Sequence, residues 1–343
     1  MPEAAGSSRP SAASSPSAKQ AGFPRTGSPL FVLGEGAGAR MHRAVRTCIL
    51  AACCLAAAFP ALAAKKHAGS SPSDFGVAEA AMASDPALRQ ELARLAEDFA
   101  ASVTARTLAR FGRNAGRRRV DMLTAPTPQY REHLRQDALN RLREGGADLA
   151  VSQFFVYADR NPAMQLVFLA FYDANAQKVL LLGADFISTG KLRPGEDSFI
   201  TPLGAFENLP ENWGYRAQGT KNERGWRGLG AKGSRVWDFG YQQAPRKFKQ
   251  GVYDSQMRLL MHATDPDNGE PRLGGTDSKG CVRISAAANA FLDKNGILDR
   301  WYEQMAASEP DKDLWLLRAD RTPAPHAGSF LVVGDSSVQS ASR

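Results

Sequence analysis

Residues 151–187 read VSQFFVYADRNPAMQLVFLAFYDANAQKVLLLGADFI, and this stretch decides the fold class. It contains three runs rich in Val, Phe, Leu and Tyr, at Val151–Tyr157, Gln165–Tyr172 and Val179–Ile187. The turn formers Asp-Arg-Asn-Pro and Asp-Ala-Asn-Ala separate these runs, so each run is predicted to be a short strand. We therefore expect a mainly β, antiparallel domain with peripheral helices, which is α+β overall.

The same domain is predicted to span residues 148–320. An apolar pattern at helical spacing predicts one helix at Ala286–Gln304, with Phe291, Leu292 and Trp301 on its apolar face. Further strands are predicted at Arg235–Phe239, Met257–Met261, Leu314–Leu317 and Phe330–Val333. Residues 321–343 are assigned to a C-terminal tail, which is expected to be disordered after Ser336.

Two helices are predicted before the β domain, between residues 85 and 147. Asp85-Pro86 supplies an N-cap and a proline at the first helical position, and leucines at helical spacing extend this helix to about Phe111. Thr127-Pro128 repeats the start signal, and Gly145-Gly146 ends the second helix. We interpret the pair as a helical hairpin that follows a polar linker at residues 64–84.

An arginine cluster (Arg113, Arg117, Arg118 and Arg119) lies between the two helices. Such a cluster is usually a solvated loop; the functional alternative is contact of the hairpin with an envelope protein, an anionic polymer or lipid. The net charge is +8, and residues 1–63 hold six basic and two acidic residues, which leaves +4 for the rest. This mild excess suits an anionic envelope, and nucleic acid is not an expected partner.

The N-terminal region has the parts of a secretory signal. Residues 1–40 are rich in Ser, Pro, Gly and Ala and are expected to be disordered or untranslated. Met41 begins a basic segment, an apolar run follows, and Ala61-Leu62-Ala63 supplies a small-x-small cleavage site. We therefore predict a signal peptide at residues 41–63 and export to the periplasm or cell envelope. The alternatives are a short transmembrane helix and lipidation at Cys53.

Cysteine usage singles out one thiol. Cys48, Cys53 and Cys54 lie inside the predicted signal, so the mature chain would retain Cys281 alone. An unpaired thiol in an oxidising compartment is either buried and inert or retained for its chemistry. One cysteine with one nearby histidine supplies too few ligands for a metal site, and neither a metal nor a cofactor is expected.

Residues 257–285 read MRLLMHATDPDNGEPRLGGTDSKGCVRIS and carry the candidate chemistry. An apolar strand ends at His262, a turn-rich excursion follows, and the chain returns at Cys281. A neighbouring imidazole can generate a thiolate nucleophile, and Gly280 lets substrate approach amides that would face an oxyanion. The structural alternatives are a core cysteine and a histidine that only ends a strand.

This segment resembles the catalytic motif of the L,D-transpeptidase (YkuD-type) family. His262 matches the first His of that motif, Ser278 its Ser/Thr, and residues 280–283 (Gly-Cys-Val-Arg) its end. Residues 188–191 (STGK) and 201–206 (TPLGAF) resemble two further family motifs in the same order. The resemblance covers about Val151 to Ser285. It implies a YkuD-like β-sandwich and a peptidoglycan stem peptide as partner.

The resemblance also implies a role for each matching residue. Cys281 would attack a diaminopimelate carbonyl in a tetrapeptide stem and expel D-alanine, while His262 takes the thiol proton and the Ala263 carbonyl orients the imidazole. Amides around Gly280 and Cys281 would hold the oxyanion, and Arg283 would pair with a substrate carboxylate. An amine would then resolve the thioester.

One position departs from the family pattern, because Lys279 stands where the family usually has a second His. Lys279 would keep a cation near the thiolate and the substrate. Two rival functions stay open at this point: an L,D-carboxypeptidase or other hydrolase on the same scaffold, and a non-catalytic wall-binding module. The motifs do not separate transfer from hydrolysis, because both share the first half-reaction.

Overall fold

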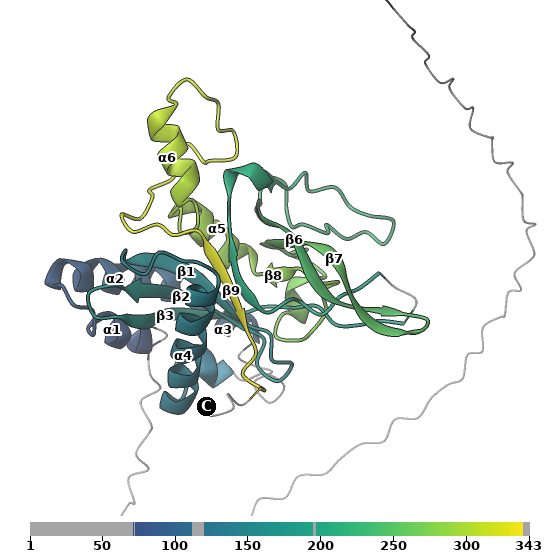
Figure 1. Ribbon diagram of the computed structural model, residues 1–343, viewed down its shortest axis with the longest axis horizontal. Coiled ribbons are helices and arrows are strands. Elements are labelled where there is room, and N and C mark those ends of the chain that lie inside the picture. The colour runs from purple at the N-terminus through teal and green to yellow at the C-terminus, as the bar shows by residue number, and fades with distance from the viewer. Residues whose placement is uncertain (1–70, 72, 112–119, 195–196, 339–343) are drawn as a thin grey trace, which may run out of the picture. The chain divides into compact units, whose positions relative to one another are not determined.

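The computed structural model describes residues 71, 73–111, 120–194 and 197–338, which form two β-sheets flanked by helices in an α+β fold (Figure 1). The helices are α1 (Asp74–Ala80), α2 (Pro86–Phe99), α3 (Ala105–Phe111), α4 (Pro128–Glu144), α5 (Ala286–Lys294) and α6 (Arg300–Ser308). A π-helical turn, Ala100–Thr104, joins α2 to α3. No helix of the described residues is long and apolar enough to cross a lipid bilayer.

The first sheet has the strand order β3-β2-β1-β9-β4. Its strands are β1 (Gln153–Asp159), β2 (Leu166–Asp173), β3 (Lys178–Phe186), β4 (Gly204–Glu207) and β9 (Phe330–Gly334). The three strands predicted from residues 151–187 are confirmed and pair antiparallel. The expectation of a purely antiparallel domain is wrong, because β9 lies parallel to β1.

The second sheet has the order β5-β6-β7-β8. Its strands are β5 (Tyr215–Arg216), β6 (Arg235–Phe248), β7 (Gly251–Ala263) and β8 (Val282–Ile284). β6 and β7 are longer than predicted and form a two-stranded ribbon that extends away from the other elements (Figure 1). β8 pairs with β7 in parallel, so this sheet is also mixed.

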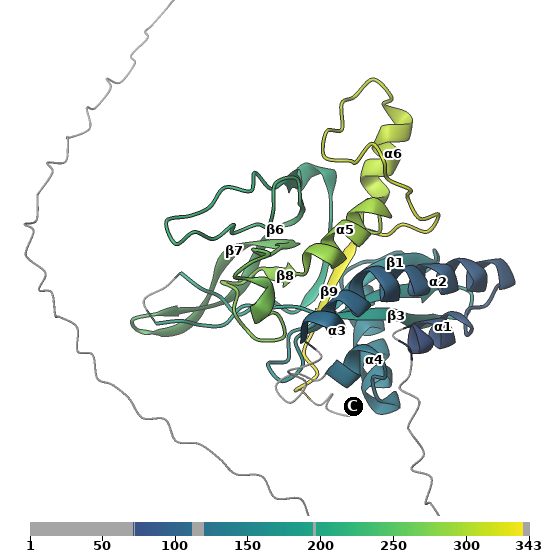
Figure 2. The same cartoon turned by 180° about the vertical axis from the view of Figure 1, so that it is seen from behind.

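The two long helices lie on opposite faces of the first sheet. Leu92 and Leu95 of α2 pack in one core cluster with Phe154, whereas Leu134 of α4 packs in another with Phe155. Figure 1 shows α4 in front of this sheet, and the reverse view in Figure 2 shows α1 and α2 in front. The predicted helical hairpin is therefore wrong. Successive strand residues point to opposite faces, and β1 is buried throughout, so both faces need a helical cover.

Three other assignments change in the structure. The predicted helix Ala286–Gln304 breaks at Asn295-Gly296, where Gly296 has φ of +55°, and yields α5 and α6. Leu314–Leu317 is not a strand. The strand predicted at Phe330–Val333 is confirmed as β9, whose five residues are all buried beside β1, so the domain extends well past residue 320 into the predicted tail.

The predicted linker 64–84 contains α1, which packs against the domain. Glu79 of α1 is 2% exposed, accepts the backbone N–H of Leu181 and pairs with Arg131 and Arg135 of α4. These contacts tie the start of the described chain to β3 and α4. Residues 1–40, the signal at 41–63, the first part of the linker and the arginine cluster at 113–119 lie outside the described residues.

Candidate active site

The pairing of β7 with β8 brings Cys281 and His262 to one sheet face. Met261 pairs with Val282, and His262 pairs with Arg283. Met261 and Val282 are fully buried in the core that the second sheet shares with the first. Because side chains alternate along a strand, His262 and Arg283 lie on the other face, and extending the alternation to Cys281, the residue before β8, puts the thiol on that face as well.

The orientation of His262 defines its tautomer. Nδ1 lies 2.7 Å from the backbone carbonyl oxygen of Ala263, and this oxygen can only accept a hydrogen bond. Nδ1 therefore carries the proton, and Nε2 presents its lone pair. The structure thus places the Ala263 carbonyl where the sequence analysis expected it.

The imidazole is uncharged at neutral pH. Burial lowers the pKa of His262 to about 4, with a smaller contribution from the charge of Arg283 and against the opposing effect of the hydrogen bond to Ala263. A neutral imidazole with a free Nε2 lone pair can accept a proton from a thiol. The side chain is 4% exposed, so its environment and not bulk water controls its charge.

Cys281 is partly exposed, unlike the buried residues on either side of it. Its Sγ lies 4.0 Å from the backbone carbonyl oxygen of Arg258. Loss of solvation raises the pKa of the thiol, while hydrogen bonding from the backbone at Leu260 and the charge of Arg283 oppose this effect. The resting thiol is therefore protonated, and attack needs a base at the moment of reaction.

The turn before Cys281 is held by Ser278, which is fully buried. Its Oγ donates to the Cys281 carbonyl oxygen at 2.6 Å and accepts the Gly280 N–H at 3.0 Å. The Gly280 amide is thus already engaged, which argues against its expected role in an oxyanion hole. The backbone N–H of Cys281 acts to lower the thiol pKa, so it is the better candidate for that role.

The three sequence motifs meet at Gly280. Thr201 Oγ1 donates to the Gly280 carbonyl oxygen at 2.7 Å and accepts the N–H of Gly190 at 2.8 Å. Gly280 has φ of +139°, a conformation that favours glycine, and an added Cβ would lie 2.8 Å from the Met257 side chain. The segments 188–191 and 201–206 therefore support the turn that presents the thiol.

Gly190→Ala is expected to damage both stability and activity. An alanine Cβ would lie 2.2 Å from the Phe199 carbonyl oxygen and 2.7 Å from the Gly280 Cα, and neither backbone atom can move without shifting the turn. We expect a loss of about 3 kcal/mol in the free energy of unfolding, at the upper end for overpacking, measured by urea denaturation. Gly228→Ala is the matched control, because its added Cβ would meet nothing within 4 Å. Equal stability of the two variants would contradict the prediction.

The two predicted substrate-binding residues differ in their surroundings. Lys279 is exposed, and its carbonyl oxygen accepts the Phe199 N–H. Arg283 is half-buried and donates to the backbone carbonyl oxygen of Asp277 at 3.0 Å. Arg193 also contacts Asp277, although the two residues lie 84 positions apart in the sequence. Sequence reasoning therefore missed Arg193 as a neighbour of Arg283, because only the fold brings them together.

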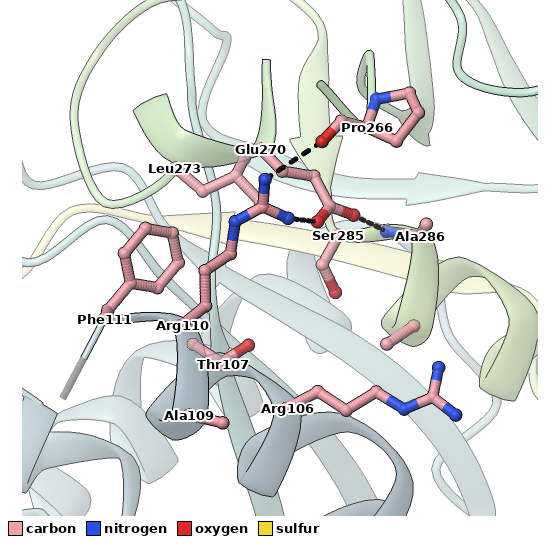
Figure 3. Close-up of a pocket in the computed structure, with 11 residues that line it drawn as sticks. Arg106, Thr107, Ala109, Arg110, Phe111, Pro266, Glu270, Leu273, Ser285 and Ala286 are labelled. Atoms are coloured by element: carbon pink, nitrogen blue, oxygen red, sulfur yellow. Dashed lines mark hydrogen bonds and ion pairs between the residues drawn. The ribbon is translucent and has the colours of Figure 1, made fainter. Parts of the chain in front are cut away.

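A cavity of about 570 Å³ lies on the α3 side of the loop between His262 and Cys281 (Figure 3). Arg110 of α3 forms an ion pair with Glu270 and donates to the Pro266 carbonyl oxygen at 2.9 Å. Glu270 also accepts the Ala286 N–H at 2.7 Å, at the start of α5. Neither candidate catalytic side chain lines this cavity, so we interpret these contacts as a brace for the loop.

No family model matches the chain, and no curated protein matches it. Among the described residues, no group of three or more His, Cys, Asp or Glu side chains is arranged to hold a metal ion. A functional assignment therefore rests on the residues and geometry of the Cys281 site.

Proposed function

We propose that this protein is a cysteine peptidyltransferase of the cell wall, with a YkuD-like catalytic domain and L,D-transpeptidase activity. The observation that carries the proposal is a partly exposed thiol, Cys281, on the same sheet face as a neutral, buried imidazole, His262. The convergence of three motif segments at Gly280 supports it further. A non-catalytic wall-binding module would need none of these features.

The proposed reaction proceeds through a thioester. Nε2 of His262 accepts the Cys281 proton as Sγ attacks the donor carbonyl, and the Cys281 N–H faces the developing oxyanion. The C–N bond to D-alanine then breaks, and the imidazolium returns its proton to the leaving amine. An acceptor amine attacks the thioester, forms the new amide and releases the thiol.

Hydrolysis is the alternative outcome, because water can resolve the same thioester. The deciding experiment incubates the purified protein with tetrapeptide muropeptides and identifies the products by mass. Cross-linked dimers support transfer, and tripeptides alone support an L,D-carboxypeptidase. The absence of either product, together with intact tetrapeptide, would refute the proposed function.

Lys279 is expected to tune the rate without taking part in bond formation. Its exposed position beside the turn suits a supporting cation near the substrate. Lys279→His is expected to retain activity, and Lys279→Ala to lower kcat/KM by about 3- to 10-fold, as expected for one exposed charge. The measurement is steady-state release of D-alanine. An alanine variant as inactive as a Cys281 variant would place Lys279 in the catalytic set.

We also propose that the protein acts outside the cytoplasm, in the periplasm or cell envelope. The proposal rests on the signal-like segment at residues 41–63 and on the single thiol that would follow it. Peptidoglycan stem peptides, the expected substrates, lie in that compartment.

A further inference from the structure

The ribbon of β6 and β7 ends in a tip, residues 246–253, that projects from the domain in both views (Figures 1 and 2). Its two lysines, Lys247 and Lys249, are exposed. Three large apolar side chains are exposed beside them: Phe248 at 36%, Val252 at 51% and Tyr253 at 56%. Large apolar side chains that gather on a protruding surface mark a site of contact with a protein or a membrane.

The exposed apolar side chains lie on both faces of the ribbon tip. Arg246 pairs with Tyr253, and Lys247 pairs with Val252. Because side chains alternate along a strand, Phe248 and Tyr253 share one face, and Val252 lies on the other. The ring centroids of Phe248 and Tyr253 are accordingly only 6.2 Å apart. A protein or a sugar chain would cover one face of the tip, whereas a lipid interface surrounds an inserted tip on all sides.

The charge of the ribbon tip is positive. Residues 246–253 contain three basic residues and no acidic one. The next acidic residue along the chain, Asp254, pairs with Pro245, further from the end of the ribbon. Lys247 and Lys249 can lay their alkyl stems against apolar surface and leave their ammonium groups among lipid phosphates. Lysines beside aromatic rings therefore complement an anionic lipid surface.

Arg246 fastens the ribbon tip to the rest of the domain. Its Nε lies 3.1 Å from a carboxylate oxygen of Asp197. Its guanidinium carbon lies 5.1 Å from the centre of the Phe248 ring and 5.5 Å from that of Phe199. The Phe199 N–H donates to the Lys279 carbonyl oxygen at 3.0 Å, in the turn that presents the thiol. These contacts fix the tip relative to the candidate active site.

We propose that residues 246–253 insert into the interface of an anionic phospholipid bilayer and hold the domain against it. The apolar side chains enter the boundary between headgroups and acyl chains, and the two lysines contact lipid phosphates. Gly251 and Arg258 lie seven positions apart in β7, and the Arg258 carbonyl oxygen is beside the thiol. The ribbon therefore holds the thiol up to about 23 Å from the bilayer. This inference does not depend on the proposed activity, which turnover of a soluble donor tests separately.

The test measures binding of the purified protein to lipid vesicles by sedimentation. Vesicles of phosphatidylglycerol, which is anionic, are compared with vesicles of phosphatidylcholine, which has no net charge. Binding to phosphatidylglycerol is expected to be at least about 10-fold tighter and to weaken as salt is added. Equal binding to the two lipids would overturn the inference. Binding to purified peptidoglycan but to neither vesicle would also overturn it and would favour a glycan partner.

Replacing the two lysines tests the electrostatic part of the contact. Lys247→Ser combined with Lys249→Ser is expected to weaken binding to phosphatidylglycerol vesicles by about 10- to 30-fold, because each basic residue near an anionic surface contributes about fivefold. Lys178→Ser combined with Lys312→Ser is the matched control, since it removes two exposed lysines outside the ribbon. Equal losses in the two double variants would show that only net charge matters and would overturn the inference.

Replacing the two rings tests the apolar part. Phe248→Ser combined with Tyr253→Ser is expected to weaken binding by about 10-fold or more, because less apolar area enters the interface. Trp315→Ser is the control, since Trp315 is 53% exposed and lies outside the ribbon. All variants keep the N-terminal segment, so differences between them report on the replaced side chains. Unchanged binding after loss of both tip rings would overturn the inference.

Discussion

Cys281→Ser is expected to abolish turnover of tetrapeptide donors, with a loss on the order of 10³-fold or more. A serine hydroxyl is far harder to deprotonate than a thiol, and His262, with a pKa of about 4, is too weak a base to compensate. The substitution is nearly isosteric at a partly exposed position, so the fold should persist. The measurement is D-alanine release, with circular dichroism as the check on folding.

Covalent labelling gives an independent readout of the same thiol. The family resemblance suggests a carbapenem as an acylating agent, and we expect one covalent equivalent by intact mass. Peptide mapping should place the adduct on Cys281, and the Cys281→Ser protein should show none. Processing of tetrapeptides by that variant at the unmodified rate would refute the mechanism and direct the search to another site in the domain.

His262→Ala is expected to slow acylation by about 10²- to 10⁴-fold, the usual range for removing a general base. The measurement is single-turnover acylation of Cys281. The imidazole is buried, so the alanine variant is compared with His262→Gln, which retains much of the volume and can still donate to Ala263. Both variants should be slow, because neither retains a basic Nε2.

The pH dependence of acylation provides the matching test on the unmodified protein. His262 must be neutral to accept a proton, and its pKa in the folded state is about 4. The rate should therefore stay level as the pH falls from 7 to about 5 and decline only near 4. An acid limb near 6.5 would show that the base has an ordinary imidazole pKa, and the assignment to buried His262 would fail.

Two controls are needed in this pH range. Asp185 is fully buried, its pKa is raised to about 6 by burial, and it accepts a hydrogen bond from Ser285, four residues after Cys281. Asp185→Asn removes that titration and should leave the acid limb unchanged.

The second control is stability. The folded-state pKa of His262 lies below its unfolded value, so the unfolded chain binds more protons between about pH 4 and 6.5. The free energy of unfolding therefore decreases as the pH is lowered through this range.

The sequence by itself determined the strands of residues 151–187, the helix starts at Pro86 and Pro128 and the candidate pair of His262 and Cys281. These features are local, because apolar runs, caps and turn formers act over a few neighbouring residues. The caps are observed as predicted: the side chain of Asp85 accepts from the N–H groups of Ala87 and Leu88, and that of Thr127 accepts from the N–H of Tyr130.

Only the tertiary structure decided how these pieces lie relative to one another. The two long helices were predicted to pack together, yet the doubly buried strand β1 separates them on opposite faces of its sheet. The strand predicted at Phe330–Val333 lies parallel to β1, between β1 and β4, and Arg193 and Arg272 converge on Asp277 from distant segments. The physical reason is that burying apolar area is non-directional, so periodicity shows that a face must be covered without showing which segment covers it.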